Sequence, residues 1–166
     1  TVTAHARELL LDSRDTWFGL TDLCLGPDGS VYVSDFYDRR TAHPDPDAEW
    51  DRSNGRIYKI EAAGTKSLPK FDLAKLTSKE LVALLKHPNG WYSDRARVLL
   101  AERRDRTVWP ELRDLARQEK DSRLALKGLW ALDGSGGFDD EIAAELLKHP
   151  GEYVRAWTVR LLGDRK

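Results

Sequence analysis

An internal repeat constrains the fold of this chain more than any other feature. The block Leu-Leu-Lys-His-Pro occupies residues 84–88 and returns 62 positions later at residues 146–150. Residues 121–132 carry a similar apolar pattern half way between them, so the repeating unit is about 30 residues long. Each unit contains two segments of helical periodicity, and a single helix pair cannot bury its apolar stripe alone. We therefore expect three helix pairs that stack on one another as an α-solenoid.

The helical region has recognisable start and stop signals. Thr77 or Ser78 is expected to cap the first helix, with Glu80 in its first turn to complement the helix dipole. Residues 134–137, Gly-Ser-Gly-Gly, are expected to form a flexible break between the second and third pairs. The predicted helix pairs are 78–86 with 91–104, 108–119 with 121–133, and 138–148 with 151–163.

The chain before residue 66 is different, with short segments rich in β-branched and aromatic residues. Turn sequences separate them, including Pro27-Asp28-Gly29 and Asn54-Gly55. Four antiparallel strands in sequence form one blade of a β-propeller, and both faces of a blade pack against neighbouring blades. We therefore expect this sheet to need further blades or another protein chain as a partner. The predicted strands are residues 6–12, 20–25, 31–36 and 56–61.

These patterns predict an α+β chain with two domains. Residues 1–65 are predicted to be a blade-like antiparallel sheet, and residues 66–166 HEAT-like helical repeats. The net charge of −1 gives no global field that would attract nucleic acid, and no apolar run is long enough to span a membrane. Cys24 is the single cysteine, which excludes an internal disulfide. The sequence contains no methionine, even at residue 1, so we expect it to be a piece of a longer protein.

The acidic loop between the last two predicted strands is the candidate site. Asp38 and His43 are proposed as ligand or general base, and Asp38 with Asp51 as oxygen ligands for Ca²⁺. Asp35 and Arg56 are proposed to bind a cofactor, Arg56 through an anionic group. The alternatives are a solvated acidic loop, turn-forming hydrogen bonds from Asp35 and Asp38, and pairing of Arg56 with Asp51 or Asp35.

The histidines and tryptophans of the repeat are expected to be structural. His87 and His149 occupy equivalent positions before proline, which favours a role at a helix C-terminus over a metal site. Tryptophans at 91, 130 and 157 fall within the repeat, where packing is expected. Trp17 and Trp50 lie outside it and are candidates for stacking on a carbohydrate.

Three sequence blocks resemble a known family. They are residues 26–38, with the motif Asp-Phe-Tyr-Asp, residues 50–60, with Trp-Asp-Arg-Ser-Asn-Gly-Arg-Ile-Tyr, and the helical segment 76–103. Together they resemble the end of the propeller and the first HEAT-like repeats in large exported bacterial proteins described as membrane-bound dehydrogenases. That family is related to the glucose/sorbosone dehydrogenase propellers. The resemblance covers roughly residues 15–135.

The resemblance implies a fragment of an exported oxidoreductase, periplasmic or at the cell surface. Its parent would be a sugar or alcohol dehydrogenase using pyrroloquinoline quinone with calcium and passing electrons to a cytochrome c with haem. This chain holds neither most of the blades nor a haem-attachment motif, so we expect no cofactor and no activity in it alone. The alternatives are a protein-interaction scaffold of HEAT repeats and a carbohydrate-binding module.

Overall fold

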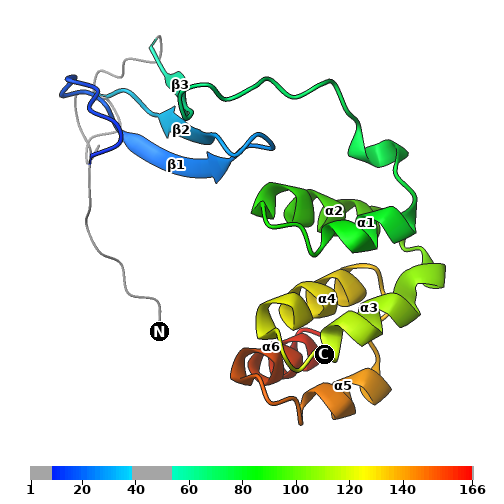
Figure 1. The fold of residues 1–166 in the computed structure, drawn as a ribbon. Helices are drawn as coiled ribbons and strands as arrows, with labels where there is room; N and C mark the ends of the chain where they lie inside the picture. Colours follow the sequence, from blue (N-terminus) through cyan, green and yellow to red (C-terminus); the bar gives the residue numbers. More distant parts are fainter. Residues whose placement is uncertain (1–8, 39–53, 166) are drawn as a thin grey trace. The chain divides into compact units, whose positions relative to one another are not determined.

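The computed structural model describes residues 9–38 and 54–165 and shows a mixed α+β chain (Figure 1). The chain divides into two compact units, Thr1–Leu68 and Pro69–Lys166. Among the described residues, the first unit contains a three-stranded antiparallel sheet and the second contains six α-helices.

The sheet is a meander in which each strand pairs with the next along the chain. Gly29, at a φ of 82°, closes the turn between the first two strands, where glycine lacks the steric penalty of a side chain. Val33 of the middle strand is buried, whereas every residue of β1 is exposed. The strands are β1 (Leu20–Leu25), β2 (Val31–Asp35) and β3 (Arg56–Ile60).

The register of β1 against β2 contains an irregularity between Leu20 and Asp22. Leu20 pairs with Asp35, whereas Leu23 pairs with Val33. Directly paired residues place their side chains on the same face, so the extra residue brings the leucines of β1 onto one face. A strand without this extra residue in its register would place Leu20 and Leu23 on opposite faces, and the observed pairing places them on the same face.

The strand predicted at residues 6–12 is not formed in its described part, residues 9–12, and three strands are present within the described residues where four were predicted. The following segment makes local turns instead. The amides of Arg14 and Trp17 bond to the side chains of Asp12 and Asp15, and Arg14 has a φ of 48°. Such side-chain to backbone bonds compete with strand pairing.

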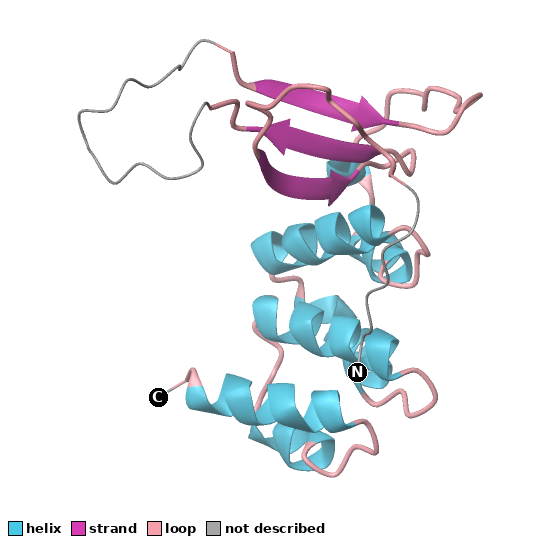
Figure 2. Cartoon of the chain, turned by 90° about the vertical axis from the view of Figure 1, so that its left-hand side faces the viewer, coloured by secondary structure: helices cyan, strands magenta, loops and turns pink. Residues whose placement is uncertain are grey.

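The helices lie within three residues of the predicted bounds and form three consecutive pairs, which Figure 2 shows as three stacked layers. The helices are α1 (Ser78–Leu84), α2 (Gly90–Arg103), α3 (Trp109–Ala116), α4 (Ser122–Gly134), α5 (Asp140–Leu146) and α6 (Glu152–Gly163). Two short 3-10 turns, η1 (Leu73–Lys75) and η2 (Arg106–Val108), precede α1 and α3.

Polar caps begin most of these helices. Thr77 and Glu80 form a capping box at α1, in which each side chain accepts the backbone N–H of the other residue. Asn89, Asp121 and Asp139 accept backbone N–H groups at α2, α4 and α5. Between the helices lies one apolar core, to which every helix contributes.

The Gly-Ser-Gly-Gly segment at 134–137 is packed, and the predicted flexible break is wrong. Ser135 is buried, and the amide of Gly137 donates to the carbonyl of Leu132 at 2.8 Å. A Cβ on Gly137 would lie 2.7 Å from Cγ of Trp109, so only glycine fits beside this indole. These glycines therefore allow a close approach of backbone to side chain.

Candidate functional site

The candidate site lies where β2 ends and β3 begins, beside the turn at residues 15–19 (Figure 1). Asp35 and Arg56 are neighbours in the β2–β3 register. Backbone bonds hold the turn against the strand end, because Phe36 N donates to Gly19 O and Asp38 N donates to Trp17 O, both at 2.9 Å. We call this group of residues, Asp15, Trp17, Asp35, Tyr37 and Arg56, the sheet-end cluster.

Asp35 organises the backbone of the cluster. Its side chain is buried, with 4% of its surface exposed. Oδ1 accepts the amides of Gly19 and Tyr37, both at 2.9 Å. Oδ2 is also buried and has no hydrogen-bond partner among the described residues. The predicted turn-forming role of Asp35 thus has direct geometric support, whereas no bound group is needed to explain the position of Oδ1.

Arg56 is held by a carboxylate, a hydroxyl and a ring. Its Nη1 lies 3.4 Å from Asp15 Oδ2 and 3.3 Å from the Tyr58 hydroxyl, and its Cζ lies 4.5 Å from the ring centre of Tyr37. The hydrogen bond to Tyr58, followed by smaller contributions including that of Asp15, raises the pKa of the guanidinium. Arg56 was predicted to pair with Asp51 or Asp35. Its observed carboxylate partner is Asp15 and not Asp35, and Asp51 lies outside the described residues.

Two aromatic side chains line the cluster. The rings of Trp17 and Tyr37 are 5.7 Å apart, and Tyr37 has a φ of 49°, which is uncommon for a residue with a side chain. The Asp35 bond to the Tyr37 amide stabilises this backbone conformation. Asp38 is buried next to it. Stored backbone strain of this kind is found at binding sites and in tight turns alike.

Part of the predicted site lies outside the described residues, namely His43, Asp51 and Trp50. Asp35 and Arg56 are paired at one end of the sheet, and the backbone amide of Asp38 bonds to Trp17 beside them. Within residues 9–38 and 54–165, no group of three or more His, Cys, Asp or Glu side chains is placed to hold a metal ion. The described residues alone therefore do not supply a calcium site.

Sequence reasoning missed Asp15 and Tyr37 as members of the cluster, and Tyr58 as a hydrogen-bond partner of Arg56. The contact of Arg56 with Asp15 joins residues 41 positions apart. The clustering of Asp and Ser in residues 12–15 was the available signal, because these residues favour turns. It predicts a turn but not the strand end against which that turn packs.

The repeat histidines are structural within the described residues, although not in the manner predicted. His149 Nδ1 accepts the amide of Gly151 at 2.9 Å, and its Nε2 lies 3.2 Å from the carbonyl oxygen of Gln118. His87 Nδ1 accepts the amide of Asn89 at 3.0 Å. Each ring therefore accepts an N–H at the start of the following helix, whereas the sequence predicts a ring that faces carbonyls at the end of the preceding one.

The sheet unit and the helical unit define a mixed α+β protein with a polar cluster at one end of its sheet. A family model described as a domain of unknown function, DUF7133, matches residues 2–64, which fall within the sheet unit. The searches found no similar curated protein and no similar solved structure. Among the described helices, none has both the length and the apolar composition that crossing a bilayer requires.

Proposed function

We propose that this chain is the junction between a β-propeller and a HEAT-like α-solenoid in an exported oxidoreductase of the sugar or alcohol dehydrogenase type. The observation that carries the proposal is the exposure of apolar side chains on the edge strand β1. Leu20, Leu23 and Leu25 share one face of β1 and are 54%, 56% and 50% exposed. Ile57, in register with Ser34 on the opposite face, is 77% exposed.

Both faces of the sheet thus carry apolar side chains in contact with water, as expected of one blade whose neighbours are absent. Complete burial of a leucine is worth about 1.5–3 kcal/mol, so covering the remaining half of three leucines is worth about 3 kcal/mol. The outer edge of β1 is unpaired among the described strands, and an open edge favours further pairing. A preceding blade would cover the leucines, and a fourth strand of the same blade would pair with this edge.

In this proposal the chain contributes architecture and has no activity alone. Asp35 is engaged by two backbone amides and Arg56 by Asp15, so neither is free to act on a substrate without rearrangement. The base or ligand roles of Asp38 and His43, the calcium roles of Asp38 and Asp51, and the cofactor roles of Asp35 and Arg56 stay predictions. No reaction step is assigned to quinone, calcium or haem.

The test compares Leu23→Lys/Leu25→Lys in two contexts, this chain and the full-length protein that contains it. In this chain the leucines are already half exposed, so the double variant should leave the unfolding midpoint nearly unchanged. In the full-length protein it should lower the free energy of unfolding by about 3 kcal/mol or more, since lysine would enter an apolar interface. Leu147→Lys, at the leucine that follows the end of α5 and is 40% exposed, is the matched control.

Equal stability of the double variant and wild type in the full-length protein would eliminate the blade interface. The oxidoreductase part is tested separately, by the visible spectrum of the full-length protein and its reduction of an electron-accepting dye with sugars and alcohols. A haem band that responds to substrate is expected. If the full-length protein showed no chromophore and no dye reduction, the redox assignment would be removed. The proposed blade interface would still stand.

A protein-interaction scaffold is the second candidate, favoured by the exposed cations and aromatic rings of α2, α4 and α6. The carbohydrate-binding alternative has weaker support, because Trp17 stacks on Tyr37 and Trp50 lies outside the described residues.

A further inference from the structure

The second helix of each pair presents the same three positions at its surface. These are the second, sixth and ninth residues of the helix, which lie on one face because they are spaced by four and three residues. None of them is fully buried in α4 or α6. In these two helices the positions hold Arg123, Lys127 and Trp130, then Tyr153, Trp157 and Arg160.

In α2 the same positions hold Trp91, Arg95 and Val98, and again none is fully buried. A hollow of about 230 Å³ adjoins this end of the face, lined by Trp91 and Arg95 together with Phe71, Leu99 and one acidic residue outside the face, Asp72. We call the nine positions on the three helices the basic–aromatic face. They include four cations and four aromatic rings and no carboxylate.

Direct contacts connect the face from helix to helix. The rings of Trp130 and Trp157 meet edge to face at 5.1 Å. Arg97 of α2 places Cζ 5.8 Å from the Trp130 ring, and Arg160 places Cζ 5.0 Å from the Trp157 ring. Cation–π contacts of this kind fix the rings and leave indole surface available to a partner. Trp130 and Trp157 thus join the face across α4 and α6, and Arg97, which lies beside the face on α2, contacts it at Trp130.

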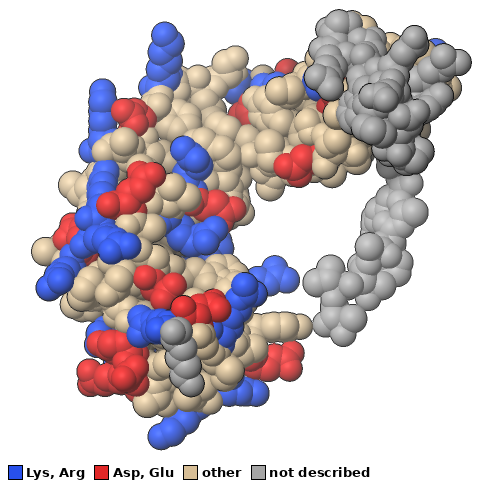
Figure 3. Space-filling view, turned by 180° about the vertical axis from the view of Figure 1, so that it is seen from behind, with Lys and Arg blue, Asp and Glu red and all other residues tan. Residues whose placement is uncertain are grey.

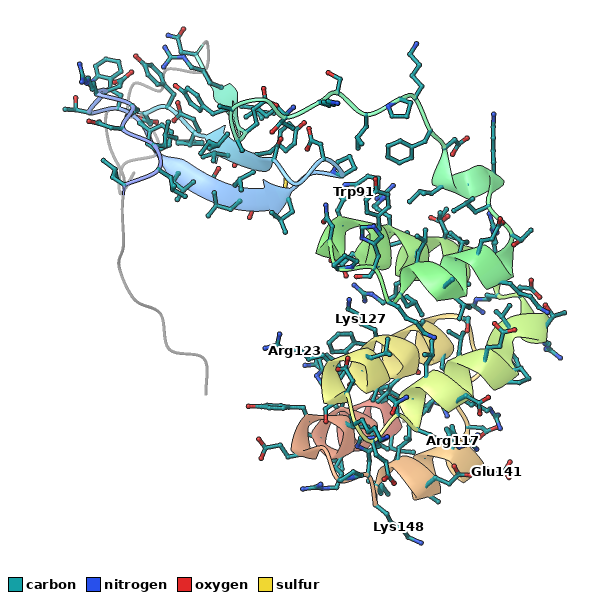
Figure 4. The ribbon with its side chains drawn as sticks, in the orientation of Figure 1. Trp91, Arg117, Arg123, Lys127, Glu141 and Lys148 are labelled. Carbon is teal, nitrogen blue, oxygen red and sulfur yellow. The ribbon has the colours of Figure 1, made fainter. Side chains whose placement is uncertain are left out.

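Several of its cations have no counter-charge in the described part of the protein. Arg123 and Lys127 stand one turn apart on α4, and neither forms an ion pair with a described residue (Figure 4). Like charges at this spacing destabilise a helix by a few tenths of a kcal/mol. Arg95 likewise makes no ion pair within residues 9–38 and 54–165, whereas Arg160 lies 3.6 Å from Asp164.

On the first helices of the pairs, in contrast, arginines form ion pairs with carboxylates. Arg113 of α3 lies 2.5 Å from Asp139, and Arg117 lies 2.6 Å from Glu145. The view in Figure 3 shows Lys and Arg interspersed with Asp and Glu over the helical unit. The absence of carboxylates is thus particular to the basic–aromatic face and does not reflect a general excess of positive charge.

We propose that the basic–aromatic face binds an extended acidic peptide segment of a partner protein. Arginine forms paired hydrogen bonds with carboxylates, and tryptophan, tyrosine and arginine dominate the binding energy of protein interfaces. Neighbouring helices pack about 8–10 Å apart, so three helices span about 16–20 Å between the outer axes, the length of roughly six extended residues. The inference does not depend on the dehydrogenase assignment.

A peptide is favoured over nucleic acid by the charge of the chain. The sheet unit carries twelve Asp and Glu against eight Lys and Arg, and the chain as a whole has a net charge of −1. Such a chain has no long-range attraction for a polyanion. Four local cations beside aromatic rings instead suit a short segment with carboxylates and apolar side chains in alternation.

The test measures binding of a fluorescein-labelled eight-residue peptide, in which Glu and Asp alternate with Leu and Phe, to the complete 166-residue chain. The comparison peptide replaces each Glu by Gln and each Asp by Asn. Fluorescence anisotropy should show binding of the acidic peptide, at least about tenfold weaker binding of the amide peptide, and a further decrease with added salt. Arg123→Glu/Lys127→Glu should weaken binding by about 10- to 100-fold.

Lys148→Glu is the matched control, because Lys148 is exposed, makes no ion pair with a described residue and lies outside the face (Figure 4). It should bind like wild type. Circular dichroism would check the fold of each variant, and Arg123→Gln/Lys127→Gln replaces the charge reversal if that variant unfolds. Absence of binding by wild type, or equal weakening by Lys148→Glu, would overturn the proposal. Tighter binding of a single-stranded oligonucleotide, lost in the double variant, would assign the face to nucleic acid and overturn it as well.

Discussion

Gly128 in the middle of α4 offers a sharp test of the helix packing. A Cβ at this position would lie 2.7 Å from Leu115 Cβ, 2.8 Å from the Ala116 nitrogen and 2.9 Å from the Leu115 carbonyl carbon. Two of these three atoms belong to the backbone of α3, so no side-chain rotation can relieve the clash. Gly128→Ala should therefore force α3 and α4 apart.

The expected loss follows from two opposing terms. Alanine improves helix propensity over glycine by about 1 kcal/mol, while an overpacked contact of this kind costs about 3 kcal/mol. The net loss of about 2 kcal/mol corresponds to a fall in melting temperature of roughly 8–16 °C for a unit of this size. Gly90→Ala, at the first residue of α2, is the matched control, because a Cβ added to Gly90 would meet nothing within 4 Å.

The assay is thermal and urea unfolding followed by circular dichroism at the helical band. Gly90→Ala should be as stable as wild type or slightly more stable. If Gly128→Ala were as stable as wild type, or more stable like the control, α3 and α4 would not approach each other as closely as described. The packing of α3 against α4 within the second pair would then have to be revised.

Two other predictions concern single polar groups. His149→Ala should destabilise the helical unit by about 2–4 kcal/mol, because it leaves the Gly151 amide without its acceptor and opens a buried space. His87→Ala, at the less buried repeat position, should lower the free energy of unfolding by about 1 kcal/mol or less in the same assay. Lys59, 2.8 Å from Asp28, lowers the pKa of that carboxyl from 3.8 to about 2. The resulting stabilisation is present above pH 3.8 and is lost as the pH falls through 2. Carboxyl-detected NMR titration should show this low pKa, and Lys59→Met should raise it towards 3.8; an unchanged pKa in the variant would show that the ion pair is not its cause.

The helices were accessible from sequence because their signals are local. Thr77 and Glu80 form the capping box that their spacing allows, and Pro88 follows the end of α1. The repeated His-Pro block marked the junction inside two of the three pairs. Caps, breakers and apolar periodicity all act within a few residues, so one sequence is enough to place the helices.

The sheet-end cluster was only partly accessible for the opposite reason. Asp35 was identified as a polar residue at a strand end, yet its partner Gly19 lies 16 residues earlier, and Arg56 meets Asp15 across 41 residues. Nothing in the spacing selects these partners over Asp51. Contacts of this range depend on where the turn at residues 15–19 packs, which follows from the tertiary structure and not from local preference.

The basic–aromatic face was hidden by unequal repeat spacing. The residue equivalent to Trp91 is Arg123, 32 positions on, but the residue equivalent to Arg123 is Tyr153, 30 positions on. A single offset of 62 aligns the first and third units and misses the second. Counting from the observed first residue of each helix restores the alignment and brings the cations and rings onto one face.

The irregularity in β1 shows how one extra residue determines which face of a strand its apolar side chains occupy. With strict alternation, Leu20 would stand opposite Leu23 and Leu25, and neither face of the strand would hold all three leucines. The register shift between Leu20 and Asp22 instead gathers them on the side of Val33, where each remains about half exposed. The shift brings no burial to these leucines within the described structure, and the interface proposed above would supply that burial. Deleting Thr21 would remove the extra residue, so Leu20, Leu23 and Leu25 would alternate regularly with Asp22 and Cys24 and stay on the face of Val33. The deletion should therefore preserve both the apolar stripe and the interface proposed for it, which urea unfolding of the full-length protein would check.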